Sequence, residues 1–533
     1  MRARTLLVWL AVIALLVDLG SYHRSHHGDS LVPVLMSLQH WTPFFWEQDR
    51  FFMLVPLLAL PFRDPLANLL VQSALGIFAG LGAYFAVGHY ALAELTDRRL
   101  WQPSAALALC LFVAFASDNT ALDWFGAQPY GVSLALGGWG LVLARAGRVL
   151  VGAVLLVLAL LVNPAALFVL GPLVVGWRLL AGAAATAPAP SRPAVASSQA
   201  RRQQRRRAAR EHARVAVAAP SRLVACSERL VRLVRRERPT AWCLGLLLGG
   251  FAVSLFASRA AEYRMAYAIL PPAEWPACWW GLLRNAWRAY LADGLAAAMA
   301  AGLLVGVIAA ALGRRWRALR QALAAAALLA ASGAACVLVM GALNWPKLND
   351  LAPRYILPAV ALWLLGSMVV ATGPLLALLS EPRRRLAAAA AAAPLLVVAL
   401  LRYGVPSLQG VRADLDRSLG ARTQEVIDSG ATHVIGDYWK VWPTVFHVNL
   451  VLASRGSERR VWGVTHRSLP TRHLWLAVPR SEMRFAMAAD DDPRRWWWSA
   501  ALGLPPLEVE RRLETIVILR PAAAAAGSPG RRG

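Results

Sequence analysis

Side chains that can move protons or hold anions crowd the stretch after the first apolar run of the chain. Residues 21–51 read SYHRSHHGDSLVPVLMSLQHWTPFFWEQDRF, in which histidines, carboxylates and arginines alternate with Trp and Phe. A carboxylate can take a proton from a hydroxyl group, and a guanidinium can hold a phosphate through two parallel hydrogen bonds. Each acid taken alone is explained equally well by an ordinary surface loop, so the stretch must be judged with the segments around it.

The loop that carries these residues is predicted to be an ordered structure at the membrane surface, and we call it the platform loop or the first outer loop. It extends over residues 21–65 and contains two apolar pieces, SLVPVLMSL and FFMLVPLLALPF. These pieces predict short helices that lie along the bilayer surface. Polar and aromatic groups held at a membrane interface suit a substrate that is half lipid and half water-soluble.

Composition places this loop in a polytopic membrane protein. Of the 533 residues, 58% are hydrophobic and 16% are charged, whereas a soluble domain carries about 25% charged residues. Leu, Ala and Val come in long blocks, as they do in membrane-spanning helices. The net charge of +26 comes mostly from Arg between these blocks, so it indicates membrane orientation rather than nucleic-acid binding. The cysteines show no metal-ligand spacing.

The apolar blocks predict about eleven transmembrane helices. When the N-terminus is placed in the cytoplasm, the dense Arg clusters between blocks fall on the cytoplasmic side, and everything after residue 402 falls outside. Asn163-Pro164 marks either a turn or a kink between two of the blocks. The blocks cover residues 6–20, 66–90, 104–117, 131–145, 149–162, 165–180, 241–258, 292–312, 322–342, 355–380 and 386–402.

Two regions differ in composition from the apolar blocks of the transmembrane domain, which extends over residues 1–402. The linker 181–239 is basic, and we expect it in the cytoplasm, disordered in its first part and amphipathic on the membrane surface in SRLVACSERLVRLVRRERP. Residues 403–520 predict a small extracytoplasmic α/β domain, followed by a disordered tail at 521–533. Its expected strands are THVIGDYW, RRVWGVT, RHLWLAVP and ETIVILRP, with a helix at KVWPTVFHVNLVLAS.

The layout and several short motifs resemble the GT-C superfamily of polytopic bacterial glycosyltransferases. The shared stretches are HHGDS and EQDR in the first outer loop, the Arg-Tyr-x-x-Pro sequence in LAPRYILPAVALWLL at 351–365, and GDYWKVWPTVF in the tail. The resemblance implies a multi-pass enzyme of the bacterial inner membrane that moves a hexosyl or pentosyl group from a polyprenyl-phosphate donor to an extracytoplasmic glycan, lipid or protein. The first loop lacks a paired Asp-Glu or Asp-x-Asp, so no residue is assigned to a metal, and dependence on a divalent cation stays open.

The resemblance also assigns roles to carboxylates of the first outer loop. The acceptor hydroxyl must lose a proton as it attacks C1 of the sugar. Asp29 is the first choice for the base, because it lies shortly after the first helix and near the interface. Asp49 and Glu47 are the alternatives, and Asp18 at the end of the first helix is a weaker one.

The candidate substrate-binding residues are basic and polar residues at the outer face. The leaving lipid phosphate needs cations, which Arg354 at the mouth of a late span can supply with help from Arg50 or Lys347. His27 is a candidate acceptor contact. Asp437 follows a predicted strand, where α/β domains often bind ligands, although it is equally explained by packing of the domain on the membrane core.

Two other function classes stay open. A transporter or flippase would use Asp118, Asp123, Asp293 or Asp350, but transporters place acids at mid-span, whereas these acids lie near the outer ends. A polymerase or ligase of surface polysaccharide would depend on Arg and His of outer loops, which residues 259–290 partly provide.

Overall fold

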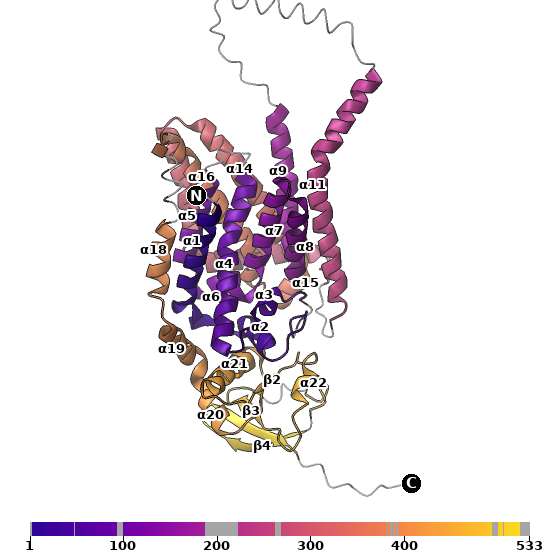
Figure 1. The fold of residues 1–533 in the computed structure, drawn as a ribbon, viewed down its shortest axis with the longest axis vertical. Coiled ribbons are helices and arrows are strands. Elements are labelled where there is room, and N and C mark those ends of the chain that lie inside the picture. Colours follow the sequence, from indigo (N-terminus) through magenta and orange to yellow (C-terminus); the bar gives the residue numbers. More distant parts are fainter. Residues whose placement is uncertain are drawn as a thin grey trace, which may run out of the picture.

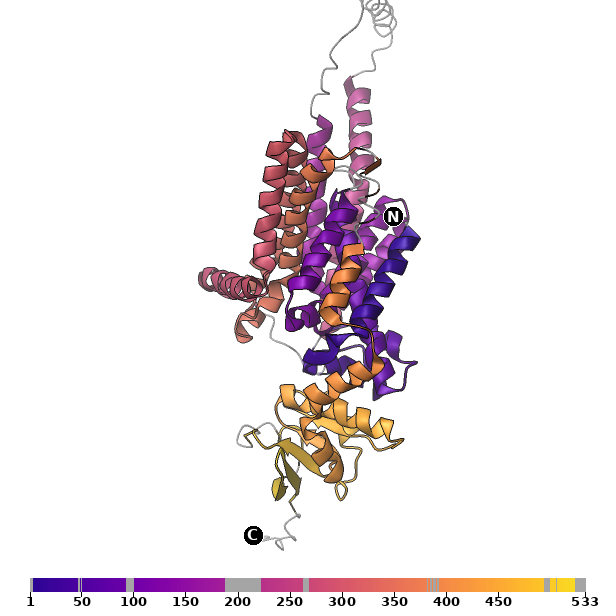
Figure 2. The same ribbon diagram turned by 90° about the vertical axis from the view of Figure 1, so that its left-hand side faces the viewer.

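The protein consists of a bundle of long helices with a small α/β domain at one end (Figure 1). A 90° turn shows the same division, with the N-terminus at the end of the bundle away from the α/β domain (Figure 2). The computed structural model describes residues 3–46, 48, 50–92, 100–186, 222–261, 268–380, 382–383, 386, 390, 393–492, 499–504 and 506–522. Glu47, Asp49 and most of the linker and tail therefore lie outside the described residues.

The described part of each predicted apolar block coincides with a helix of the bundle, and residues 387–389 and 391–392 of the last block lie outside the described residues. Continuous runs of Leu, Ala and Val favour helices because the helix satisfies every backbone polar group within the segment. The helices are α1 (Ala3–Asp18), α4 (Pro65–Leu92), α5 (Trp101–Phe115), α7 (Tyr130–Arg145), α8 (Val149–Val162), α9 (Leu167–Thr186), α11 (Arg222–Ser258), α13 (Leu295–Leu312), α14 (Trp316–Ala342), α16 (Leu357–Leu378) and α18 (Ala393–Tyr403).

Within the described part of the chain, fewer helices have the length and composition of a membrane crossing than there are predicted blocks. Among the described residues, five helices are long and apolar enough to cross a membrane, or up to seven if each of two bent pairs forms one span. The predicted multi-pass helical fold is therefore confirmed, but the count of eleven crossings is not.

The structure decides the question at Asn163-Pro164. The helices on either side are bent by 120°, so the sequence marks a turn rather than a kink. The Asn163 side chain accepts a hydrogen bond of 3.0 Å from the Ala165 backbone nitrogen, which begins the short helix η3 (Pro164–Ala166) before α9.

The basic segment before residue 240 does not form a helix of its own. Residues 222–239 continue without a break into the apolar residues 240–258 as α11. In Figure 1 this helix extends beyond the bundle at the end opposite the α/β domain.

The first outer loop folds as a compact cap on the bundle, as its two apolar pieces predict. It contains η1 (Ser21–Ser25), α2 (Gly28–Leu38) and α3 (Leu54–Ala59). An antiparallel bridge between Phe44 and Phe51 closes the segment that connects the two α-helices. The remaining helical elements of the bundle are α6 (Asp118–Leu122), η2 (Asp123–Ala127), η4 (Pro272–Glu274), α12 (Trp275–Ala292), α15 (Asn344–Leu348) and η5 (Pro353–Ile356).

The C-terminal domain is the predicted small α/β unit, built on a five-stranded sheet in the order β2-β1-β3-β5-β4. The strand β1 pairs in parallel with β2 and β3, and β5 pairs antiparallel with β3 and β4. Its elements are α19 (Leu408–Leu419), η6 (Gly420–Arg422), α20 (Thr423–Asp428), β1 (His433–Ile435), α21 (Tyr438–Ser454), β2 (Trp462–Val464), α22 (Arg472–Trp475), β3 (Phe485–Ala488), β4 (Leu507–Arg512) and β5 (Ile516–Pro521).

One of the predicted strands forms a helix, and two strands of the sheet were not predicted from the sequence. RHLWLAVP forms the short helix α22, whose Trp475 is fully buried and packs in the domain core. The strand β4, LEVERR, could not be predicted from its sequence pattern because it is a largely exposed edge strand with an irregular register. The strand β3, FAMA, is buried at every position and has no period-2 alternation.

The C-terminal domain and the first outer loop share one hydrophobic core. Leu31 and Leu35 of α2 lie in the same buried cluster as Val445 and Phe446 of α21. The rings of Trp46 and Trp442, both almost fully buried, are 5.8 Å apart. Burial of such large side chains contributes about 25 cal/mol per Å² of apolar surface, so the domain is packed onto the loop rather than tethered beside it.

Candidate active site

Asp29 is held at the junction between the first outer loop and the C-terminal domain. Its side chain is buried, with 5% of the residue exposed. Its Oδ1 accepts a 2.7 Å hydrogen bond from the Tyr438 hydroxyl of α21, and its Oδ2 accepts a 3.3 Å hydrogen bond from Gln128 Nε2. Three segments far apart in sequence therefore meet at this carboxylate.

The start of α2 explains why Asp29 occupies this position. His27 is the N-cap, with extended backbone angles. The Ser30 hydroxyl accepts a hydrogen bond from the His27 backbone nitrogen at 3.1 Å and donates to its carbonyl oxygen at 2.8 Å. Asp29 follows in the first helical turn, where the helix dipole favours a negative charge.

Gly28 allows the close approach of Tyr438. A Cβ atom at this position would lie 2.5 Å from Cε1 of the Tyr438 ring. A side chain here would therefore push the ring away from α2, and with it the hydroxyl that bonds Asp29.

His27 adds a neutral imidazole beside the carboxylate. Burial lowers the pKa of this imidazole, the Asp29 carboxylate raises it, and the Arg354 guanidinium lowers it. The ring lies edge-to-face on Trp439 with centroids 5.4 Å apart. Its Nδ1 is buried and has no hydrogen-bond partner within the described part of the chain, so it can accept or donate a bond to a ligand.

Arg354 brings a positive charge to the same place from the mouth of α16. It belongs to η5, and its guanidinium carbon is 5.4 Å from the Tyr355 ring centroid and 6.0 Å from that of Trp439. Its Nε is buried, and the described residues offer it no acceptor. A buried donor without an acceptor is costly, and a bound anion would remove that cost.

Asp123 is a second carboxyl group that interacts electrostatically with Arg354, and it lies in the segment between α5 and α7. Burial raises the pKa of Asp123 to about 7, while the Arg354 guanidinium lowers it and the Asp29 carboxylate raises it. Its Oδ1 is buried and unpaired among the described residues. The sequence associated Asp123 only with a transporter; its place in the aromatic stretch DWF between two apolar blocks was the available signal.

The C-terminal domain contributes further side chains through the loops after β1 and β2. These strands are parallel neighbours, so their carboxyl ends lie at one edge of the sheet, as in many ligand-binding α/β domains. The Arg467 guanidinium lies 5.6 Å from the Tyr438 ring centroid, and its Nε donates to His466 Nε2 at 3.0 Å. The sequence analysis did not identify Gln128 and Tyr438 as contacts of Asp29, nor Arg467 as a neighbour of the Tyr438 ring.

Asp437 serves the fold of this edge. Its Oδ1 accepts a 3.0 Å hydrogen bond from the Trp439 backbone nitrogen and so caps α21. Its own backbone nitrogen donates to Asp491 Oδ2 at 2.8 Å. The predicted role of Asp437 as a direct substrate contact stays a prediction. Its neighbours Tyr438 and Trp439 contact the group formed by Asp29, His27, Asp123 and Arg354, which we call the Asp29 cluster.

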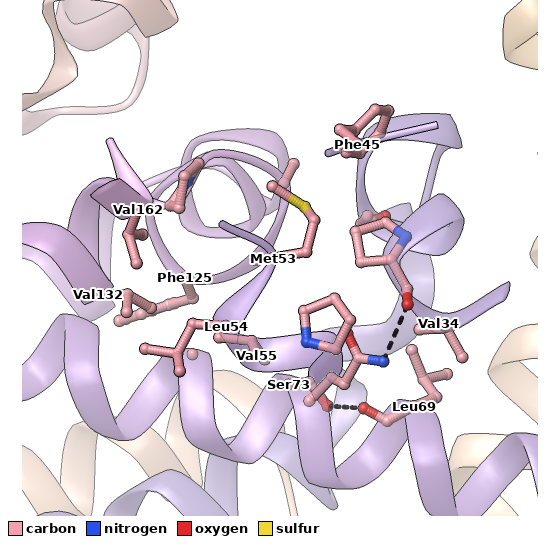
Figure 3. A pocket seen from close by; sticks show the side chains of 18 of the residues that line it. Val34, Phe45, Met53, Leu54, Val55, Leu69, Ser73, Phe125, Val132 and Val162 are labelled. Carbon is pink, nitrogen blue, oxygen red and sulfur yellow. Dashed lines mark hydrogen bonds between the residues drawn. The ribbon is translucent and has the colours of Figure 1, made fainter. Parts of the chain in front are cut away.

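Arg50 lies beside the cluster rather than in it. Its guanidinium is 4.3 Å from the Phe45 ring centroid, and Nη1 donates to the Ala127 carbonyl oxygen at 3.3 Å, one residue before Gln128. It helps line a cavity of about 70 Å³ under the outer loop. Figure 3 shows that apolar side chains such as Val34, Met53 and Val132 surround this cavity.

Lys347 is placed elsewhere by the contacts of the structure. It forms an exposed ion pair with Glu274, with 2.6 Å between Nζ and Oε2. No contact among the described residues joins it to Asp29 or Arg354, so its predicted help to Arg354 has no geometric support.

Asp18 belongs to a separate buried network at the end of α1. It accepts a hydrogen bond from Ser73, and its Oδ1 lies 3.3 Å from His23 Nε2. The rings of His23 and His26 are joined by a 2.7 Å contact between Nδ1 and Nε2. These partners leave Asp18 well satisfied within the scaffold.

Three of the acids that a transporter would use have other surroundings. Asp118 pairs with Arg402 at 2.7 Å. Asp293 accepts from the Ser117 backbone nitrogen at 3.1 Å and from the Thr120 hydroxyl at 2.8 Å. Asp350 lies in the tight turn after α15 at a φ of 53°. None of the three belongs to the Asp29 cluster in the described structure.

The cluster can perform a proton transfer next to an anion. Asp29 is a carboxylate fixed from two sides, Arg354 is a cation with an unused donor, and Trp439 offers an aromatic face with 46% exposure. No group of three or more His, Cys, Asp or Glu side chains that could hold a metal ion occurs among the residues described.

Comparison with known proteins finds similarity in structure alone. No protein-family profile and no curated protein matches the chain. The chain is similar to two crystal structures of ArnT from Cupriavidus metallidurans, one bound to undecaprenyl phosphate and one in the apo state, each at 12% identity over 97% of both chains, with TM-scores of 0.42 and 0.29.

Proposed function

We propose that the protein is a membrane glycosyltransferase of the GT-C type that moves a sugar from a polyprenyl-phosphate donor to an acceptor hydroxyl at the outer face. The observation that carries the proposal is that the buried, positioned Asp29 carboxylate interacts electrostatically with Arg354 at the mouth of a transmembrane helix, and that the Arg354 Nε has no hydrogen-bond partner among the described residues. A lipid-linked phosphate would reach this level from the bilayer, and a hydroxyl acceptor would reach it from the outside.

In the proposed reaction Asp29 is the general base. The acceptor oxygen attacks C1 of the sugar while its proton passes to Asp29 Oδ2, the oxygen that holds only the longer bond to Gln128 among the described residues. The bond between C1 and the phosphate oxygen breaks, and its electron pair leaves with the polyprenyl phosphate. Asp29 ends as the neutral acid.

Arg354 stabilises the leaving group. The phosphate gains negative charge as the C1–O bond breaks, and a guanidinium in a partly water-excluded site stabilises that charge more strongly than it would in water. The aromatic faces of Tyr355 and Trp439 hold the guanidinium without neutralising it. Nε therefore stays available to the phosphate.

A transporter is the alternative from another class. Its candidate acids Asp118 and Asp293 are occupied by Arg402 and by Ser117 and Thr120 at the outer ends of the helices. These partners favour a structural role for both acids, and so they favour interfacial chemistry over a path through the membrane.

The test is turnover of purified protein with a panel of radiolabelled polyprenyl-phosphate sugars, followed by release of free lipid phosphate. Undecaprenyl phosphate, the lipid bound in one of the similar structures, sets the chain length of the first donors. Asp29→Asn keeps the shape of the side chain but cannot take the proton, so kcat should fall roughly 10²–10⁴-fold with donor binding nearly intact.

Two further variants complete the test. Arg354→Ala should raise the donor KM as well as lower kcat, because the phosphate contact is lost in both the ground state and the transition state; Arg354→Lys should recover only part of the loss. Asp428→Asn, which changes an exposed acid of α20 bonded to Gln424, is the control. Turnover of Asp29→Asn at the rate of the unmodified protein would refute the proposal.

A further inference from the structure

The strongest contact of the Asp29 carboxylate comes from the C-terminal domain, from a residue 409 positions away in the chain. The Tyr438 hydroxyl donates to Oδ1 at 2.7 Å, whereas the Gln128 amide reaches Oδ2 at 3.3 Å. A hydrogen bond from a hydroxyl to a carboxylate at such a distance is charge-assisted and about twice as strong as one between neutral groups. Tyr438 is therefore the group that fixes the orientation of the carboxylate.

The phenol is itself held on several sides. Tyr438 is 4% exposed, and its ring packs against Gly28, where even a Cβ would be too close. Trp439 meets the ring edge-to-face at 4.9 Å, and the Arg467 guanidinium is 5.6 Å from its centroid. A phenol confined in this way can direct a carboxylate oxygen with little freedom.

The position of Tyr438 depends on docking of the whole C-terminal domain. It is the first residue of α21, which Asp437 caps. The same helix carries Trp442 and Phe446 into the core shared with the outer loop. Displacement of the domain would therefore withdraw the hydroxyl from Asp29.

We propose that Tyr438 is a positioning residue that aims Asp29 Oδ2 at the acceptor hydroxyl, which makes the docked C-terminal domain a part of the reaction centre. Because Tyr438 occupies Oδ1, the more weakly bonded Oδ2 is the oxygen that receives the proton. The inference rests on the proposed role of Asp29 as the base. Tyr438 takes no proton in the reaction; it restricts the rotation of the carboxylate.

A double-mutant cycle on the full-length protein tests this role. Tyr438→Phe removes the hydroxyl and keeps the ring, so kcat should fall roughly 10- to 100-fold, while the donor KM stays within about two-fold of the original. In Asp29→Asn the base is absent, and adding Tyr438→Phe should change the residual turnover by less than about two-fold.

The matched control is Tyr84→Phe, which also removes a buried hydroxyl, but one without a hydrogen-bond partner among the described residues. It should leave kcat unchanged. All variants are compared by thermal unfolding and gel filtration in detergent. If Tyr438→Phe is poorly folded, Tyr438→Met gives the cycle a second replacement, with a flexible side chain that can pack against Gly28.

The outcomes separate this inference from the proposed function. Full turnover by Tyr438→Phe, or losses that multiply in the double variant, would overturn the positioning role while leaving Asp29 as the base. Turnover by Asp29→Asn at the original rate would overturn both. A loss of turnover in the single Tyr438→Phe variant, with no further loss when the same change is added to Asp29→Asn, would support the inference.

Discussion

At the scale of single residues, the cluster combines one cation with two carboxyl groups of different character. Asp29 is bonded by Tyr438 and Gln128. Asp123 has an oxygen without a hydrogen-bond partner among the described residues, and burial raises its pKa to about 7. Below that pH Asp123 is mostly neutral and leaves Arg354 to a bound phosphate; above it, the ionised carboxylate competes for the guanidinium.

The donor KM should therefore depend on pH through Asp123. We expect it to rise roughly 3- to 10-fold between pH 6 and pH 8.5, because the phosphodiester of the donor keeps its charge in this range while Asp123 loses its proton. In Asp123→Asn the donor KM should be flat across the same range. Steady-state kinetics with varied donor at fixed acceptor measure both.

Asp64→Asn serves as the reference for this experiment, since Asp64 is an exposed acid whose Oδ1 accepts a bond from the Ala67 backbone nitrogen. It should follow the unmodified protein at every pH. If Asp123→Asn shows the same rise in donor KM, the titrating group lies elsewhere.

At the scale of elements, the start of α2 and the start of α21 face each other across a single glycine. The backbone at Gly28 lies against the Tyr438 ring, and a Cβ there would approach Cε1 to 2.5 Å. Both helix starts are capped by local contacts, Ser30 with His27 in one and Asp437 with Trp439 in the other. Their mutual position is set by the shared core rather than by these caps.

Gly28→Ala should disturb this contact without touching the chemistry of any side chain in the cluster. Overpacking in a well-packed core costs about 1–3 kcal/mol, and the displaced Tyr438 should lower kcat by at least about ten-fold. Turnover and thermal unfolding are measured together. Gly245→Ala, at a helical position with open space around the added methyl group, should leave both unchanged.

A Gly28→Ala variant with full kcat would show that the hydroxyl of Tyr438 keeps its place despite the added methyl group. The close packing of α2 on α21 would then have no bearing on the rate. A variant that loses stability but keeps its kcat would assign Gly28 to the fold alone.

At the scale of the whole molecule, the two ends of the bundle differ in charge and content. The C-terminal domain lies at one end, and the ends of α9 and α11 that flank the basic linker lie at the other (Figure 1). Basic segments next to transmembrane helices stay in the cytoplasm. The bundle therefore separates the C-terminal domain from the basic linker, as the predicted extracytoplasmic domain and cytoplasmic linker require.

Thiol labelling tests this orientation. In a background without the native cysteines, Ser457→Cys on the C-terminal domain should react with a membrane-impermeant reagent in intact cells. Ser197→Cys in the linker should react only after the membrane is disrupted. Labelling of both positions from the same side would contradict the orientation predicted from the Arg clusters.

The sequence by itself determined the helical bundle, the platform loop and the type of the C-terminal domain. Apolar blocks must become helices in a bilayer because no water satisfies their backbone groups, and the described part of each block coincides with a helix. Asp29, His27 and Arg354 could also be chosen from the sequence, because Asp29 and His27 lie in the loop directly after the first apolar block and Arg354 lies at the mouth of a late block. The missed strand LEVERR shows the opposite case, an exposed edge without a distinctive pattern.

Only the tertiary structure decided which of these residues meet. Tyr438 and Gln128 both contact Asp29, and α21 and the first outer loop share one buried core. A contact between residues 409 positions apart cannot be predicted from a local sequence pattern. Lys347 has the right charge but pairs with Glu274 instead, and Asp123 acquires its raised pKa from burial. The residue type determines what chemistry a side chain can perform, whereas the packing of distant segments determines which side chains lie close together and which are buried.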